Sequence, residues 1–158
     1  MLFRSKIQDL AESLNTSTNS LLKMQFVLQR GGGLGADEAA EAMKTFSINI
    51  SNAANGIGKA LPTFERLGFE ADTLAALNLM KPSDQLRVVG EELSKLQAPA
   101  DRLAAIVKIF GTGGDKMAAF FAGGGDAIQR MTEKAERLEL AVSDIDAAGI
   151  ADLVEKTE

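Results

Sequence analysis

The sequence predicts an all-α fold of several amphipathic helices joined by Gly- and Pro-rich turns. Three observations support this prediction. Apolar residues recur at three- and four-residue spacings along most of the 158-residue chain, which is the period of one helix face. Helix-favouring Ala and Leu are abundant, and only 3 Pro interrupt them. The 15 Gly gather mainly between periodic segments, where they end helices. We expect a helical bundle or extended helical hairpins, with a coiled-coil-like longest helix.

Residues 1–35 are expected to form N-terminal helices followed by a Gly-rich loop. A short helix is predicted from Ser5 to Leu14, and Ser17 is the expected N-cap of a second helix that ends at the glycine run. We interpret Gly31–Gly35 as a flexible connector. A phosphate cradle is disfavoured because no strand precedes the glycines and no Lys-Ser/Thr follows them.

Residues 36–68 are expected to form a long heptad-like helix. It begins near Asp37, whose negative charge suits the first turn of a helix, and runs to about Leu61. Glycines and a proline predict a break within Gly56–Pro62, since Gly weakens a helix and Pro lacks a backbone donor. The pattern closes at Leu67 and Gly68.

This long helix carries an apolar seam with spacings of three and four residues: Met43, Phe46, Ile50, Ala53, Ile57, Leu61 and Phe64. Two interpretations of the seam remain open. It could be a self-association face that makes the chain a homo-oligomer, or it could pack on neighbouring helices of the same chain.

Residues 69–158 are expected to form a helical domain. A short helix is predicted over Asp72–Leu79, and Pro82 and Pro99 each suit the first position of a further helix because their φ is fixed. The expected inward-facing residues of these last two helices are Leu86, Val89, Leu93, Leu96, Leu103, Ile106, Val107 and Phe110.

A helical hairpin turn is predicted at Phe110, Gly111, Gly113 and Gly114, after which Met117, Phe120 and Phe121 form a short apolar helix. Gly123–Gly125 is expected to interrupt the chain again. A 3-4-3 spacing then resumes at Ile128, Met131, Ala135 and Leu138. Ser143 followed by Asp146 resembles a capping box for a last helix, which is still in progress at Glu158 and is therefore expected to be truncated.

Composition excludes several classes of function. The chain has no Cys and no His, which removes disulfides, zinc–thiolate sites and His-dependent catalysis. A formal charge of -5 disfavours direct nucleic-acid binding. No apolar run reaches the roughly 18 residues that a membrane helix needs, and residues 1–10 carry charges where a signal peptide would be apolar.

We considered three kinds of reactive site and favour none of them. Residues 109–116, IFGTGGDK, lack the spacing and the strand of a nucleotide loop, so a hinge between helices is preferred. Asp144 and Asp146 are too few for an oxygen cage around a cation. The acidic pairs Glu91/Glu92 and Glu133/Glu136 are typical of solvated helix faces. We therefore predict no enzyme activity, no catalytic or metal-binding residues and no cofactor.

A set of residues in a fixed order nevertheless points to a family: Phe64, Leu67, Gly68, Pro82, Gln85, Leu86, Leu93, Leu96, Pro99, Arg102, Ala104, Phe110, Gly111, Gly114, Leu138, Leu140, Ser143, Asp146 and Ala147. Together with Ser17, Leu21, Gln25 and Phe26 upstream, they strongly resemble the tape measure protein of long-tailed phages and prophages. The resemblance covers nearly the whole chain. Lys81 and Ala98 depart from it, because the family usually has a capping Ser or Asp before these prolines.

The resemblance implies a structural role in a phage or prophage tail. A tape measure protein is a long, mostly helical chain that sets tail length while tube protein polymerises around it, and it leaves before DNA passes. The implied partners are further copies of the chain and the tail tube and tail assembly proteins. The implied location is the virion tail, assembled in the bacterial host cytoplasm. The alternative is a non-viral helical adaptor module of a bacterial protein. A third class is an enzyme, which some tape measure chains carry in a separate region.

Overall fold

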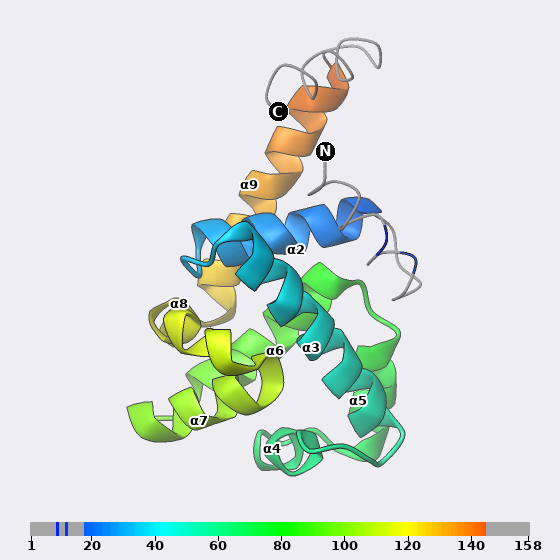
Figure 1. Cartoon of the computed structure of the whole chain (residues 1–158), viewed down its shortest axis with the longest axis vertical. Coiled ribbons are helices and arrows are strands. Elements are labelled where there is room, and N and C mark those ends of the chain that lie inside the picture. The colour runs from blue at the N-terminus through cyan, green and yellow to red at the C-terminus, as the bar shows by residue number, and fades with distance from the viewer. Residues whose placement is uncertain (1–8, 10–11, 13–17, 145–158) are drawn as a thin grey trace.

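The computed structural model describes residues 9, 12 and 18–144, and every regular element among them is a helix, which confirms the all-α prediction. In chain order the elements are α2 (Thr18–Arg30), α3 (Ala36–Ala54), α4 (Leu61–Arg66), α5 (Ala71–Asn78), α6 (Pro82–Ser94), α7 (Pro99–Phe110), the 3-10 helix η1 (Thr112–Met117), α8 (Ala118–Ala122) and α9 (Gly124–Asp144) (Figure 1). The predicted helix over residues 5–14, the predicted cap at Ser17 and any helix beyond Asp144 lie outside the described residues.

Many helix ends fall where glycine and proline predicted them. The helix α2 ends immediately before Gly31, and α6 and α7 begin at Pro82 and Pro99. Past the end of α4, Gly68 has φ 96°, a left-handed conformation that costs glycine little. These helix ends and starts follow from local residue types alone. Glycine lacks a Cβ and tolerates the left-handed conformation, and proline has a fixed φ and lacks a backbone donor.

The long helix expected from Asp37 to Leu61 is shorter than predicted. The helix α3 ends at Ala54, and six residues separate it from α4, which begins at Leu61. Gly56 and Gly58 take positive φ in this connection, so the predicted break is confirmed and replaces the continuous helix. At 19 residues α3 is also not the longest described helix, which is α9 with 21.

One prediction near the end of the described chain is wrong in part. Among the glycines expected to interrupt it, only Gly123 lies between α8 and α9, whereas Gly124 and Gly125 are the first two residues of α9. Ser143 belongs to α9, and the last helix predicted to follow it, with Asp146, lies outside the described residues. Local sequence overstated the interruption at Gly124 and Gly125, because packing of α9 along α6 and α8 stabilises a helix that weak helix formers begin.

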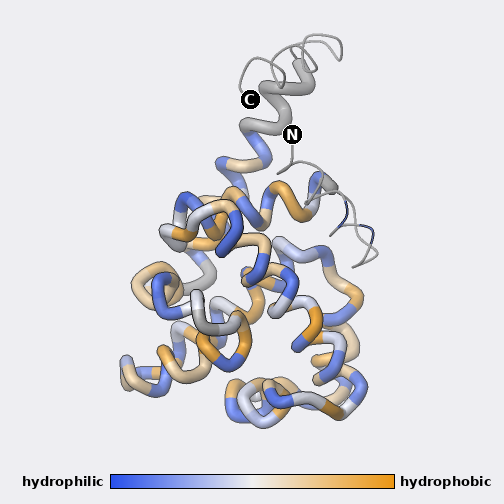
Figure 2. Tube along the Cα trace, in the orientation of Figure 1, coloured by the Kyte–Doolittle hydropathy of each residue, from blue (hydrophilic) through white to orange (hydrophobic). Residues whose placement is uncertain are grey.

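One hydrophobic core unites the three segments proposed from the sequence. Its buried residues run from Leu21 in α2 to Ile128 in α9, so residues 1–35, 36–68 and 69–158 contribute to the same core wherever they are described. The helix α9 packs along α6 and α2, and α3 packs on α5, α2 and α7. Figure 2 shows that hydrophobic and hydrophilic residues intermingle along each helix, as expected when each helix buries one face.

Aromatic rings lie at the centre of this core. The rings of Phe46 in α3 and Phe110 in α7 stack with centroids 4.5 Å apart, and Phe110 stacks on Phe121 of α8 at 5.1 Å. All three side chains are buried. The stack therefore joins the long helix α3 to both sides of the predicted hairpin turn.

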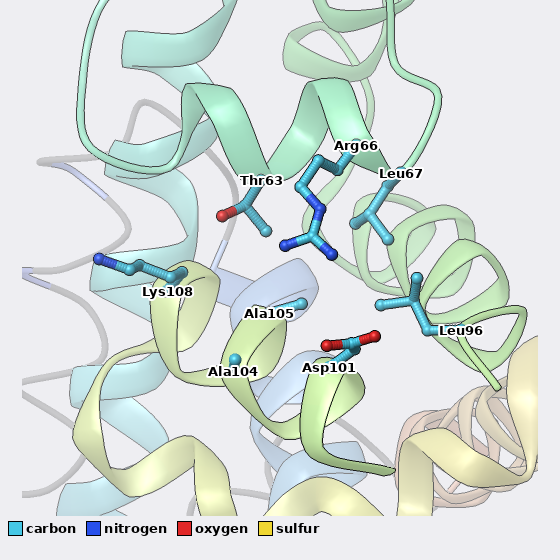
Figure 3. A pocket seen from close by; sticks show the side chains of 8 residues that line it. All are labelled: Thr63, Arg66, Leu67, Leu96, Asp101, Ala104, Ala105 and Lys108. Carbon is cyan, nitrogen blue, oxygen red and sulfur yellow. The ribbon is translucent and has the colours of Figure 1, made fainter. Parts of the chain in front are cut away.

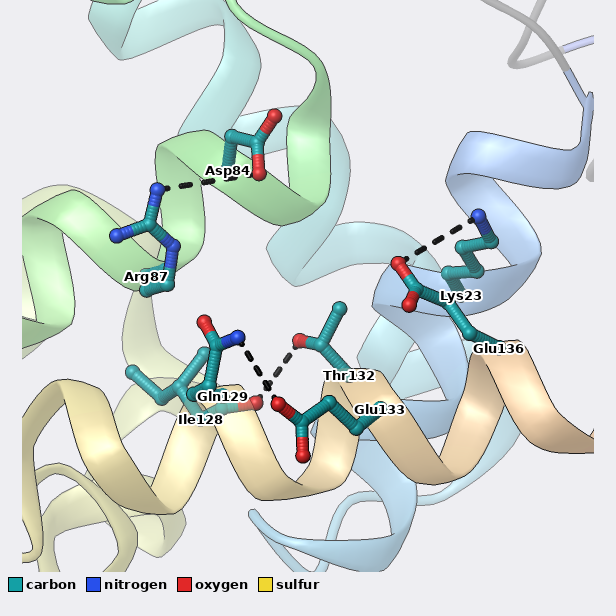
Figure 4. Close-up of polar contacts among 8 residues, drawn as sticks. All are labelled: Lys23, Asp84, Arg87, Ile128, Gln129, Thr132, Glu133 and Glu136. Carbon is teal, nitrogen blue, oxygen red and sulfur yellow. Dashed lines mark hydrogen bonds and ion pairs between the residues drawn. The ribbon is translucent and has the colours of Figure 1, made fainter.

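Exposed polar contacts accompany the packing of α9. Lys23 of α2 lies 4.0 Å from Glu136 of α9, and Gln129 donates a hydrogen bond to Glu133 one turn later (Figure 4). Because the Lys23–Glu136 pair is long and Glu136 is exposed, it adds little to stability compared with the buried face of α9. That face contributes Ile128 and Ala135.

Candidate functional site

The hairpin turn predicted from the sequence lies between α7 and η1. Gly111 has φ 94°, a conformation that side chains rarely adopt, and its N–H donates to the Val107 carbonyl at 2.9 Å. The Gly114 N–H then donates to the Gly111 carbonyl at 3.0 Å. The six-residue 3-10 helix η1 follows this turn, with Met117 at its end and Phe121 of α8 both buried in the core.

The two later glycines of this turn differ in what surrounds them. A Cβ on Gly114 would lie 2.8 Å from Ile106 Cγ2 and 3.1 Å from the Ile106 carbonyl oxygen. A Cβ on Gly113 would have Glu38 Oε2 as its nearest neighbour, at 4.0 Å. Close packing of η1 on α7 therefore requires glycine at 114 but not at 113.

An ion pair fastens the turn to α3. Lys116 Nζ donates to Glu38 Oε2 at 2.7 Å, and the Gly35 N–H donates to Glu38 Oε1 at 3.2 Å. These two hydrogen bonds lower the pKa of Glu38 from its ordinary 4.5, and the Glu38 carboxylate raises the pKa of Lys116. A carboxylate beside the glycines would also repel a phosphate, which agrees with the hinge interpretation of IFGTGGDK.

The apolar seam of the sequence does not form an exposed face. Its residues Met43, Phe46, Ile50, Ala53 and Phe64 are buried in the core of the same chain, and Leu61 is half-buried. Ile57 lies in the α3–α4 connection and is 59% exposed. The burial favours the interpretation that this seam packs on neighbouring helices of the same chain.

The inward face of α7 was also predicted incorrectly in part. Leu103 is 39% exposed, whereas Ile106, Ile109 and Phe110 are buried. Residues 99–104, the first half of α7, are exposed except for the half-buried Arg102, whereas burial begins at Ala105. The inward-facing set omitted Ile109, although it lies three residues after Ile106 and therefore on the same face of α7.

The first turns of α6 and α7 make the same kind of contact with the preceding helix. In α6, Pro82 is the first residue, and Gln85 Nε2 donates to the Leu77 carbonyl at the end of α5, at 3.0 Å. In α7, Pro99 is the first residue, and an Arg102 guanidinium nitrogen donates to the Leu96 carbonyl just after α6, at 2.7 Å. In both helices, the side chain three residues after the first-position proline donates a hydrogen bond to a backbone carbonyl at the end of the preceding helix. Carbonyls at a helix end lack partners within the helix, so this bond fixes the two helices to each other.

A groove lies between α4 and α7 (Figure 3). It has a volume of about 120 Å³, and its apolar surface comes from Leu67, Leu96, Ala104 and Ala105. Arg66, Asp101 and Lys108 supply charge around it, with the Arg66 and Asp101 side chains extending into the groove from opposite sides. Within the described part of the chain, these three side chains form no ion pair or hydrogen bond.

The acidic residues weighed as catalytic pairs lie on helix surfaces. Glu92 pairs with Lys95 at 3.0 Å, Glu133 accepts the hydrogen bond from Gln129, and Glu136 faces Lys23. Among the described residues no group of three or more acidic side chains could hold a metal ion. Asp146 lies outside these residues, as does the side chain of Asp144.

No helix within residues 18–144 has both the length and the apolar character that a bilayer-crossing segment requires. No protein-family model, curated protein or solved structure matches this chain.

Proposed function

We propose that this chain is a structural, non-catalytic module of a phage or prophage tail, similar to part of a tape measure protein. The observation that carries the proposal is the role of the residues that resemble the family. Pro82 with Gln85 and Pro99 with Arg102 fix consecutive helices, and Gly111 sets the turn after α7. The shared pattern is therefore a signature of helical architecture, from which function follows by analogy.

The surface chemistry is compatible with this role. In a tail the chain would contribute helical faces to assembly and would not need reactive groups. Its formal charge of -5 opposes adhesion to DNA phosphates, which suits a protein that occupies the tail tube first and leaves it before DNA passes. The partners in this role are further copies of the chain and the tail tube and tail assembly proteins.

The test is whether the chain is present in tails. An antibody raised against the purified chain would be applied to particles released from the induced encoding strain and separated from soluble lysate on a density gradient. We expect the chain to sediment with tails. In-frame deletion of residues 61–122 should give particles with no tails or with tails of altered length in electron micrographs, and Ile57→Gln on the exposed surface should leave tails normal.

Two results would contradict the proposal. One is a chain that remains in the soluble lysate while the deletion strain makes normal tails. The other is a gene neighbourhood that lacks tail tube and tail chaperone genes. Either result would favour a helical adaptor module of a bacterial protein.

A further inference from the structure

An exposed leucine projects from the connection between α5 and α6. Leu79 is 87% exposed, the largest value among the exposed large hydrophobic residues of the described chain, and Met80 beside it is also exposed. Single exposed leucines are ordinary, but one with nearly all of its surface in water, next to a second apolar side chain, marks a candidate contact site.

Two opposite charges flank this leucine. Asp72 lies seven residues earlier on the exposed side of α5, so it occupies nearly the same face about 10 Å along the helix. Lys81 follows two residues after Leu79 and is exposed. The surface formed by Asp72, Leu79, Met80 and Lys81, which we call the Leu79 knob, is therefore acidic at one end and basic at the other.

The groove between α4 and α7 has the complementary properties. Its volume of about 120 Å³ is comparable to the roughly 150 Å³ of a dry cavity that accepts benzene, so it has room for one leucine side chain. Its apolar surface is bordered by cationic Arg66 and Lys108 and by anionic Asp101. These charges lack partners within the described chain and could pair with Asp72 and Lys81 of another molecule.

We propose that the Leu79 knob of one copy of this chain inserts into the α4–α7 groove of a second copy. The two surfaces differ, so the contact is heterologous and leaves a free knob and a free groove at the ends of each assembly. Copies therefore add head to tail into open chains or closed rings. This proposal depends on the groove and the knob alone and not on a role in phage tails.

A contact with one main apolar anchor is small, so we expect concentration-dependent association with a dissociation constant between about 1 µM and 1 mM. Loss of a buried leucine should weaken it by about tenfold or more. Sedimentation equilibrium of the full 158-residue chain across this range measures the effect. Interference optics are needed, because the chain has no Trp and no Tyr to absorb at 280 nm.

Three matched glutamine variants separate this contact from other association. Leu79→Gln removes the knob and leaves the groove intact. Ala104→Gln places a longer side chain at the groove and leaves the knob intact. Ile57→Gln changes another exposed hydrophobic residue, 59% exposed, and serves as the control. Far-UV circular dichroism checks that each variant keeps wild-type helicity, which is expected because all three positions are exposed.

Wild type and Ile57→Gln should associate equally strongly, and Leu79→Gln and Ala104→Gln should each self-associate about tenfold or more weakly. An equimolar mixture of these two variants should form a dimer that grows no further, because only one intact knob and one intact groove can meet. A wild-type chain that stays monomeric to about 1 mM would overturn the proposal and leave the groove to a different protein. Association of either single variant at wild-type strength, or a mixture that remains monomeric, would overturn it as well.

Discussion

Phe110→Ala should destabilise the fold strongly, because Phe110 joins α3, α7 and α8. Its side chain is 2% exposed and stacks on Phe46 at 4.5 Å and on Phe121 at 5.1 Å. Truncating a buried phenylalanine costs about 3–5 kcal/mol, and loss of two aromatic pairs places the expected cost in the upper half of that range, about 4 kcal/mol. The free energy of unfolding of a native domain is about 5–15 kcal/mol in total, so this loss is a large fraction of it.

Urea denaturation followed by circular dichroism at 222 nm is the appropriate assay, since the chain lacks Trp and Tyr for fluorescence. The slope m for a domain of this size is about 2 kcal/mol/M. A loss of about 4 kcal/mol should therefore lower the urea midpoint by about 2 M. Where wild type is too weakly stable for this range, a stabilising osmolyte added equally to both proteins moves both midpoints upward.

Leu103→Ala on the same helix is the matched control. Periodicity predicts that Leu103 and Phe110 both face inward, but Leu103 is 39% exposed. Its truncation should cost about 1 kcal/mol or less and shift the midpoint by about 0.5 M. Equal shifts for the two variants, or a Phe110→Ala shift below about 0.5 M, would refute the assignment of the aromatic stack to the centre of the core.

Two other predictions concern the hairpin turn. Gly114→Ala should lower the free energy of unfolding by about 1–3 kcal/mol in the same urea assay, because the added Cβ would press on Ile106. Gly113→Ala should be neutral or slightly stabilising, and the reverse order of the two variants would show that η1 does not pack on α7 as described. Because the pKa of Glu38 is lowered on folding, its contribution to stability is present above pH 4.5 and is lost as pH falls through the folded value. The difference in urea midpoint between wild type and Glu38→Gln should therefore shrink as pH is lowered below 4.5, and a difference that stays constant would contradict the contribution of the Lys116 pair.

The sequence could predict which residues start and stop helices, because those signals are local. Pro82 and Pro99 begin helices through their fixed φ, and Gly111 ends one through a backbone conformation that other residues avoid. The turn at residues 110–114 was found for this reason. The partner of Lys116 could not be found, since Glu38 is 78 residues away in the sequence.

By itself, then, the sequence determined the fold class and the helix boundaries that Pro and Gly set, such as the starts of α6 and α7 and the end of α2, because these depend on residues within one or two turns of each other. Only the tertiary structure decided which apolar residues are covered. Ile50 and Ile57 belong to one seam by spacing, yet the first is buried and the second is exposed, because the chain leaves the helix after Ala54. Periodicity gives the direction of a side chain, whereas burial depends on whether another helix reaches it. Leu79 is exposed for the same reason, because no other helix covers it. The groove between α4 and α7 likewise depends on how two helices pack, which periodicity does not give.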